Sequence, residues 1–343
     1  MKPIIRHIAI VAGVSPGTVS NALNDKKGVS EEKKQLIIKV AKDMGYIKNS
    51  SKKDKTQKII KLIVYKKHGY IVSDTPFFST LIEGIELQCK DQGYELLISH
   101  IFHGDYLAKE INDNFRVSNI SGIIILATEM KPEDLIFLKN LDIPIVVIDN
   151  YFNNLDFDYV TINNIRGAYK AVTYLAENGH KNIGHLQSSI PINNFLERTQ
   201  GYKNALKDYG LIENTNFSIK LEPTLEGSYK EMKCILQNDN IELPTAFFAD
   251  NDIIAFGAIK ALKENGIKLP KDISIVGFDD MPFGKISSPR LTTVKVHKSY
   301  IGKVAVNRLM EKIKETGNFN EKIEINTELV IRSSVSKFEN KMD

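Results

Sequence analysis

The sequence contains few cysteines and no long run of apolar residues. Its two cysteines, Cys89 and Cys234, are far apart and form neither a CxxC pair nor a metal-ligand spacing, which argues against a disulfide framework and for a reducing compartment. No stretch approaches the ~18 consecutive apolar residues that a membrane span requires. In the N-terminal segment MKPIIRHIAIVAGVS, His7 interrupts the short apolar run, unlike in a secretory signal. We therefore expect a soluble cytoplasmic protein.

The motifs of common catalytic sites are also missing. The sequence has no GxGxxG, no GxxxxGK[ST] and no HExxH. The DND of residues 250–252 is similar to the DxD of phosphoaspartyl transferases, but this motif is too short to be specific. His100 and His103 lack further ligands at the spacing of a metal site. We expect no enzyme activity, no metal and no cofactor.

Charge and length suggest a small basic head on a larger body. The chain has 343 residues, 42% of them hydrophobic, which is enough for more than one core. Residues 1–61 hold 14 Lys and Arg against 5 Asp and Glu, whereas the remaining residues hold 32 against 37. A basic head is either a solvated tail or a nucleic-acid contact. The helical pattern distinguishes these alternatives.

Three short amphipathic helices are predicted in this head. Gly13 can end the first helix in a left-handed conformation, Ser15 is placed to cap the second, and Pro16 suits the first position of the second. The third begins near Ser30. The residues expected on the inner faces are Ile5, Ile8, Ala9, Ala12, Val19, Ala22, Leu23, Leu36, Ile37, Val40, Ala41 and Met44.

This pattern is a helix-turn-helix, and it leaves the outer face of the second helix for DNA. Small residues let the helix approach a groove, hydroxyls suit phosphate oxygens, and Asn21 can hydrogen-bond a base edge. Any one of these residues is also compatible with an ordinary solvent-exposed helix, but with the basic charge they predict DNA binding. The candidate contacts are Ser15, Pro16, Gly17, Thr18, Ser20, Asn21, Asn24 and Ser30.

Residues 8–46, IAIVAGVSPGTVSNALNDKKGVSEEKKQLIIKVAKDMGY, resemble the DNA-binding head of the lactose/galactose repressor family. The family signature reads roughly VAxxAGVSxxTVSRxLN and then VSxxTRxxVxxAxxxLGY. The resemblance implies that residues 16 and 17 open the recognition helix and that Tyr46 and Asn49 contact the DNA backbone. Asn21 holds a position often occupied by arginine, so the operator sequence is not predicted.

The next segment, YIKNSSKKDK, departs from the family. Members usually continue YxPNxxARxL, a hinge whose leucine enters the minor groove. Here Lys48 replaces the proline, Lys53 falls at the arginine and Lys55 at the leucine. Because an ammonium group prefers to stay hydrated near phosphates, Lys53 and Lys55 are predicted to contact the DNA backbone. A disordered basic linker is the alternative.

From about residue 60, apolar strands alternate with segments of helical length. This pattern predicts an α/β fold with parallel sheets covered by helices on both faces, in two doubly wound subdomains. The first series of expected strands is IKLIVYK (60–66), YELLIS (94–99), GIIILA (122–127) and IPIVVID (143–149); the second is DYVTI (158–162), NIGHLQ (182–187), TAFFAD (245–250) and ISIVGFDD (273–280). The domains expected are a helix-turn-helix head (1–49), a basic linker (50–59) and an effector-binding and dimerisation domain (60–338).

Several predicted strands end in polar residues, where ligands of such folds bind. Each of these residues has the alternative of an ordinary helix cap or turn, and Arg198 that of a solvated helix residue. Together they suit a polyhydroxylated ligand, with Phe77 and Phe78 as apolar faces. The polar strand ends are Asp149, Asp250, Asn251, Asp279 and Asp280.

Segments of the body also resemble the family. DTPFFSTLIEGIE is similar to its NPFFxxLxxGIE, RTQGY to RxxGY, ADNDIIAFGAIKAL to ANDxxAxGAxxAL, and SIVGFDDMPF to SVVGFDDxxx. In the family, these segments line the effector pocket of a domain similar to periplasmic sugar-binding proteins. The resemblance implies a small-molecule effector, expected to be a sugar, held by Phe77, Phe78, Asp149, Arg198, Asn251 and Asp279.

The sequence thus predicts a repressor that binds a pseudo-palindromic operator under the control of an effector. We expect a homodimer, because one short helix reads too few base pairs for selectivity. The final segment, SKFENKMD, lacks the leucine-rich tetramerisation tail of the lactose repressor. A sugar-binding protein without a DNA role is the alternative that the body alone permits. The identity of the effector and whether it releases or recruits DNA are left open.

Overall fold

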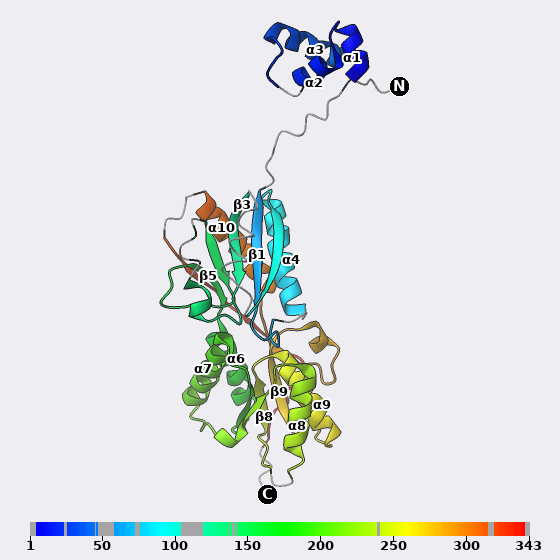
Figure 1. Cartoon of the computed structure of the whole chain (residues 1–343). Helices are drawn as coiled ribbons and strands as arrows, with labels where there is room; N and C mark the ends of the chain where they lie inside the picture. The colour runs from blue at the N-terminus through cyan, green and yellow to red at the C-terminus, as the bar shows by residue number, and fades with distance from the viewer. Residues whose placement is uncertain are drawn as a thin grey trace. The chain divides into compact units, whose positions relative to one another are not determined.

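The computed structural model describes residues 5–23, 26–44, 46, 58–72, 76–103, 119–136, 138, 141, 143–238, 241–314 and 319–339. The chain divides into two compact units, residues 1–57 and 58–343 (Figure 1).

The smaller unit consists of three helices around a small apolar core, as predicted. They are α1 (Ile5–Val11), α2 (Pro16–Leu23) and α3 (Glu31–Asp43). Gly13 has a φ of 66° after α1, and Ser15 caps α2, since its Oγ accepts a hydrogen bond from Thr18 N at 3.0 Å. The fully buried core residues are Ile8, Ala9, Val19, Ala22, Ile37 and Ala41.

One residue predicted for this core is not buried. Leu36 is 49% exposed. The buried stripe of α3 runs through Ile37 and Ala41, one turn apart. Leu36 lies ~100° around the helix axis from Ile37 and therefore falls outside this narrow stripe.

The larger unit contains two six-stranded sheets. The first has the order β11-β5-β4-β3-β1-β2, with all neighbours parallel. The second has the order β12-β10-β9-β8-β6-β7, parallel except that β12 runs antiparallel to β10. The strands of the first sheet are β1 (Ile59–Lys66), β2 (Glu95–Phe102), β3 (Ile120–Leu126), β4 (Ile145–Ile148), β5 (Asp158–Ile162) and β11 (Lys322–Ile325). Those of the second are β6 (Ile183–Ser188), β7 (Ser218–Leu221), β8 (Ala246–Ala249), β9 (Ser274–Asp279), β10 (Thr292–Lys295) and β12 (Glu328–Val330).

Helices cover these sheets in pairs and define two subdomains (Figure 1). On the first sheet, α4 (Pro76–Asp91) packs beside α10 (Lys298–Ile313). On the second, α6 (Asn164–Glu177) packs with α7 (Asn193–Asp208), and α8 (Leu225–Leu236) with α9 (Asp252–Glu264). We call the first sheet with α4 and α10 the first subdomain, and the second sheet with α6 to α9 the second subdomain.

The opposite face of the first sheet is covered differently from the prediction. Alternate strand residues such as Ile123 and Val147 point into a separate core with Leu135, Leu138 and Phe157. Among the described residues, this cover consists of loops and the short 3₁₀ helix η1 (Pro132–Asp134) rather than a long helix. Two further 3₁₀ helices, η3 (Thr215–Phe217) and η4 (Pro282–Lys285), lie in the second half of the chain.

All eight predicted strands are present, but one belongs to the other sheet. We predicted that DYVTI opens the second series, whereas β5 pairs in parallel with β4, with Val147 opposite Tyr159. The reason is that the chain passes between the subdomains three times: from β5 to α6, from β10 to α10 and from β11 to β12. The short strands β7, β10, β11 and β12 were not predicted.

Candidate functional site

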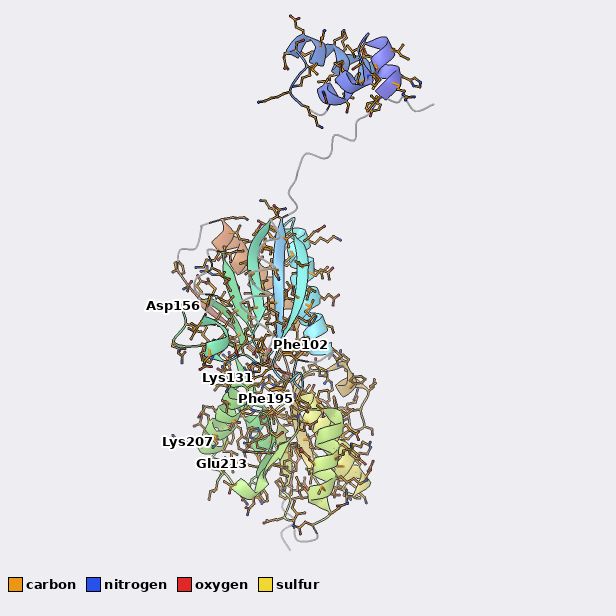
Figure 2. All side chains as sticks on the ribbon, in the orientation of Figure 1. Phe102, Lys131, Asp156, Phe195, Lys207 and Glu213 are labelled. Atoms are coloured by element: carbon orange, nitrogen blue, oxygen red, sulfur yellow. The ribbon has the colours of Figure 1, made fainter. Side chains whose placement is uncertain are left out.

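All six residues predicted to hold a small molecule line one cavity between the two subdomains. Its volume is about 290 Å³. Its lining includes Phe195 of α7, which lies near the junction of the subdomains, whereas Lys207 at the other end of this helix points outward (Figure 2). The predicted residues on its wall are Phe77 and Phe78 from α4, Asp149 after β4, Arg198 from α7, Asn251 before α9 and Asp279 at the end of β9.

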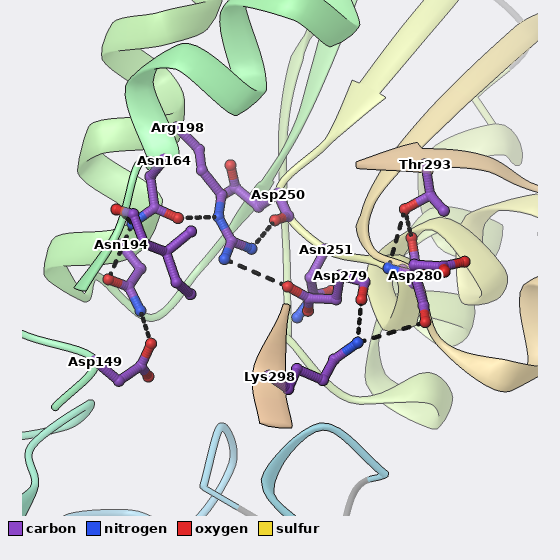
Figure 3. Close-up of polar contacts among 12 residues, drawn as sticks. Asp149, Asn164, Asn194, Arg198, Asp250, Asn251, Asp279, Asp280, Thr293 and Lys298 are labelled. Atoms are coloured by element: carbon purple, nitrogen blue, oxygen red, sulfur yellow. Dashed lines mark hydrogen bonds and ion pairs between the residues drawn. The ribbon is translucent and has the colours of Figure 1, made fainter. Parts of the chain in front are cut away.

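Arg198 is the central cation of this cavity (Figure 3). It is only 3% exposed, which excludes the alternative of a solvated helix residue. Its Nε donates to Asn164 Oδ1 at 3.0 Å, and its Nη1 donates to the backbone carbonyl of Asp250. Its Nη2 lies 3.4 Å from Asp279 Oδ1. Contacts on three sides therefore fix the guanidinium before any ligand binds.

The carboxylate of Asp149 is held from two sides. Its Oδ2 accepts from the Thr128 hydroxyl at 2.6 Å, and its Oδ1 accepts from Asn194 Nδ2 at 3.0 Å. Burial raises the pKa of Asp149 to about 6, although these hydrogen bonds and the charge of Arg198 oppose the rise. Asp149 belongs to the first subdomain and Asn194 to the second, so this contact joins the subdomains across the cavity.

Asp279 lies across the cavity from Asp149, in the second subdomain, and its backbone φ is 111°. Burial raises its pKa, and the cations of Arg198 and Lys298 oppose the rise. Lys298 donates to the backbone carbonyls of Asp279 and Asp280, and burial lowers the pKa of this lysine. In the described part of the chain, Asp279 Oδ1 has no hydrogen-bond partner and meets Arg198 only as an ion pair. The charge of this buried oxygen is therefore balanced by the guanidinium of Arg198.

The remaining polar strand ends have structural partners. Asp250 accepts from Ser188 N at 2.8 Å, and its Oδ1 lies 2.8 Å from His185 Nε2. Asp280 pairs with Arg332. Neither residue lines the cavity. Asn251 combines two roles, because it caps α9 by accepting from Ile254 N at 2.9 Å and also contributes to the cavity wall.

A further buried carboxylate, Asp252, holds the segment after β9 against β10. Its oxygens accept from Met281 N at 2.7 Å and from the Thr293 hydroxyl at 2.6 Å. Burial raises the pKa of Asp252 to about 8, and the neighbouring charge of Asp279 adds to the rise. The DND segment therefore serves helix capping and packing, in agreement with the view that it is not a catalytic motif.

In the helix-turn-helix, the predicted contact residues fall at the start and outer side of α2. Ser15, Pro16 and Gly17 are exposed, whereas Thr18, Ser20 and Asn21 are half-buried. The hydroxyls of Ser15 and Thr18 lie 2.8 Å apart. Ser30 is exposed before α3, and Tyr46 packs partly against the head core. Asn24, Asn49, Lys53 and Lys55 lie outside the described residues.

Comparisons with known proteins identify the family. Residues 4–49 match the model described as bacterial regulatory proteins, lacI family. The HTH-type transcriptional repressor PurR of Histophilus somni (strain 129Pt) is 34% identical over 336 residues, covering 96% of this chain and 98% of the relative. The chain belongs to the lacI family of bacterial regulatory proteins. A second relative of the same name, from Pasteurella multocida (strain Pm70), is 33% identical over 336 residues, with 96% and 98% covered.

Other matches agree with the lacI-family assignment. Residues 172–335 match a periplasmic binding protein-like domain. A solved lacI-family regulator from Enterococcus faecium with bound ribose is 26% identical, with a TM-score of 0.69 and coverage of 82% of this chain and 100% of that one. The lac repressor dimer bound to operator and the anti-inducer ONPF is 22% identical, with a TM-score of 0.73 and coverage of 98% and 100%; it supports the fold.

The protein is accordingly a DNA-binding transcriptional repressor of the lacI family with an effector-binding domain. Its relatives are named as repressors and not as enzymes, in agreement with the prediction. The alternative of a sugar-binding protein without a DNA role is thereby set aside. Within the described residues, no helix has the length and apolar character needed to cross a membrane.

Sequence reasoning missed three side chains that organise this lacI-family cavity: Asn164, Asn194 and Thr128. A signal existed for Asn194, which lies four residues before Arg198 and thus on the same face of α7. None existed for Asn164, whose position depends on close packing of α6 and α7. That packing requires Gly201, since a Cβ there would meet the backbone carbonyl of Ile165.

Proposed function

We propose that this repressor responds to a sugar bound in the cavity lined by Asp149, Arg198, Asn251 and Asp279. The observation that carries the proposal is the pair of buried carboxylates that face the cavity, Asp149 from the first subdomain and Asp279 from the second. Carboxylates accept hydrogen bonds from adjacent hydroxyls, whereas Arg198 and Asn194 can donate to hydroxyl oxygens. A sugar presents both kinds of group.

The aromatic residues also favour a sugar over a flat nucleobase. The Phe77 and Phe78 rings meet edge to face, with centroids 4.9 Å apart and an angle of 69° between their planes. This arrangement offers apolar patches to sugar carbons but no slot between parallel rings. The volume of about 290 Å³ suits a small ligand such as a monosaccharide. Bound ribose in the relative from Enterococcus faecium supports this ligand class.

Such a ligand would control the protein by joining the two subdomains. Asp149 lies on one side of the cavity, and Arg198, Asn251 and Asp279 lie on the other. A sugar that bonds both sides stabilises one relative arrangement of the subdomains over another. The shift equals the difference between its affinities for the two arrangements.

On DNA, we propose that a homodimer places two copies of α2 on the half-sites of a pseudo-palindromic operator. Asn21 would hydrogen-bond a base edge, while Ser15, Thr18, Ser20 and Ser30 would contact phosphates. Tyr46, Asn49, Lys53 and Lys55 would add further contacts to the backbone. The assignments on α2 rest on its exposed start and on the basic composition of residues 1–61, whereas those of Tyr46 and Asn49 rest on the resemblance to the family.

A thermal-shift screen of pentoses, hexoses, disaccharides and nucleobases tests the effector proposal. A ligand at a hundred times its Kd adds ~2.7 kcal/mol of stability, so at least one sugar should raise the Tm of the wild type. Arg198→Ala is the matched variant, in which the same sugar should cause a much smaller shift. Shifts by nucleobases alone would overturn the assignment of the ligand class.

A further inference from the structure

The loop of residues 67–72, which links β1 toward α4, is organised around one buried carboxylate. Gly69, Tyr70 and Ile71 of this loop line the cavity described above. The carboxylate belongs to Glu129, which follows β3 and is only 4% exposed. Glu129 itself does not line that cavity.

Five backbone N–H groups of the loop donate to Glu129. Oε2 accepts from Lys67 at 2.6 Å, His68 at 3.0 Å and Gly69 at 3.2 Å. Oε1 accepts from Ile71 at 3.1 Å and Val72 at 2.9 Å. Oε1 also lies 3.3 Å from the imidazole Nδ1 of His68. Nearly every N–H group of the loop thus points to one side chain.

The chemistry of this contact requires an anion. Consecutive N–H groups that converge form a concave site for negative charge. Gly69 has a φ of 73°, a left-handed conformation that glycine adopts without strain. Burial acts to raise the pKa of Glu129, but the N–H donors outweigh it and the pKa is lowered. A neutral amide at this position could not accept all five hydrogen bonds.

The neighbouring residue, Thr128, supports Asp149 on the same side of the cavity. Thr128 donates to Asp149 at 2.6 Å. Thr128 and Glu129, two consecutive residues in the turn that follows β3, therefore orient a ligand-facing carboxylate and the loop that carries Tyr70. A change in either one alters the shape of the same cavity.

We propose that Glu129 is a positioning residue that holds loop 67–72 in its cavity-lining conformation before the effector binds. Its consequence for effector affinity rests on the proposed function, whereas its role in ordering the loop does not. A loop already ordered costs no further conformational entropy on binding, so loss of the carboxylate weakens binding without removing any direct contact.

Hydrogen exchange of the full chain without ligand tests the role. Glu129→Gln should speed the exchange of residues 67–72 by about tenfold or more, because hydrogen bonds to a charged group are lost. Glu129→Asp keeps the charge and should restore part of the protection. Glu133→Gln, an exposed change in η1, is the matched control and should behave as the wild type.

Two exchange results would overturn the proposal. One is a loop in Glu129→Gln that is as protected as in the wild type. The other is faster exchange by the same factor in the strands of the second sheet, which would show a general loss of stability instead of a local one.

Affinity for a sugar is the second readout, with D-ribose as the first probe. In Glu129→Gln we expect about tenfold weaker binding or more, with operator affinity unchanged. Unchanged sugar affinity in a variant whose loop exchanges faster would also overturn the positioning role. If the wild type binds no sugar at all, the proposed function fails, and the exchange comparison alone decides the role of Glu129.

Discussion

The guanidinium of Arg198 lies 3.7 Å from the centre of the Phe278 ring. Phe278 directly precedes Asp279, whose carboxylate forms an ion pair with the same guanidinium. The ring stacks on one side of the cation while Asn164 and Asp250 accept its hydrogen bonds. Such a desolvated, fully oriented cation is well placed to donate to a ligand without reorganisation.

Arg198→Ala should abolish the effector response and leave operator affinity nearly intact. Loss of hydrogen bonds from a charged donor should weaken effector binding by roughly ten- to a hundredfold, while the DNA-contacting head keeps its own residues. Calorimetric titration with the sugar and gel-shift titration with operator measure the two effects. Arg198→Lys is the control; because lysine lacks the planar fork, it should recover only part of the affinity. Normal effector binding by Arg198→Ala would remove Arg198 from the site.

Asp149 should make the stability of the ligand-free protein fall as the pH rises. The folded-state pKa of about 6 exceeds the ordinary value of 3.8, so between these pH values the folded state binds more protons than the unfolded chain. The free energy of unfolding therefore decreases from about pH 4 to about pH 6, by roughly 3 kcal/mol at most, and is flat above that for this group. Asp149→Asn should remove this decrease, because an amide does not titrate in this pH range. The Thr128 hydroxyl, which donates to Asp149 in the wild type, can accept from the amide instead.

Unfolding midpoints of the wild type and Asp149→Asn across pH 4.5 to 7 check this sign. The difference between the two proteins should grow in favour of the variant as the pH rises. Sugar affinity should change in the opposite sense and weaken below about pH 6, where the Asp149 carboxylate is protonated and accepts fewer hydrogen bonds. If the unfolding midpoints of the two proteins change with pH in the same way, the raised pKa of Asp149 is contradicted.

Asn21→Ala should change which bases the repressor prefers, at a cost of ~1–3 kcal/mol at one position of each half-site. The reason is that a side-chain amide reads a base edge, whereas a hydroxyl on phosphate carries no sequence information. Selection of binding sites from random DNA measures the preference. Ser30→Ala provides the comparison, because it should weaken binding to all sequences about equally. If both variants select the wild-type site, Asn21 does not read bases.

Lys55→Leu should reduce the salt dependence of operator binding. Each phosphate neutralised adds ~0.9 to the slope of log K against log salt, so loss of one cation should lower the slope by about one. If the linker can fold on DNA, the added leucine should also increase the operator bend. Affinity measured at several salt concentrations and a bending assay check both effects. A wild-type complex that is already sharply kinked by side chains between bases would contradict this view of the linker.

The sequence was most informative where local chemistry decides structure. Runs of β-branched residues such as residues 122–127 predicted strands, and Ser15 with Pro16 predicted the start of α2. The sequence did not predict correctly to which sheet every strand belongs. Nothing in DYVTI distinguishes a strand paired with β4 from the first strand of a new sheet, because the pairing is set by distant residues.

The residues of the cavity also fall into those that the sequence reveals and those that only the packing reveals. Polar residues at the ends of buried strands, such as Asp149 and Asp279, stand out in a sequence because a buried strand does not need them. Asn164 does not stand out, since asparagine near a helix start is an ordinary cap, and the sequence signal for Asn194 is its spacing of four residues from Arg198. Their importance comes from the packing of α6 against α7, a contact between segments that only the folded chain brings together.

The threefold crossing of the chain also determines when the protein can fold during synthesis. The first sheet begins with β1 at Ile59 but lacks its edge strand until β11, which ends at Ile325. The helical cover of the first sheet is incomplete until α10 has left the ribosome. Until then, Leu62 and Ile124 lack the helix that buries them. Nascent chains stalled before α10 should therefore expose apolar surface and attract chaperones. A fragment that ends near residue 150 should not be stable by itself.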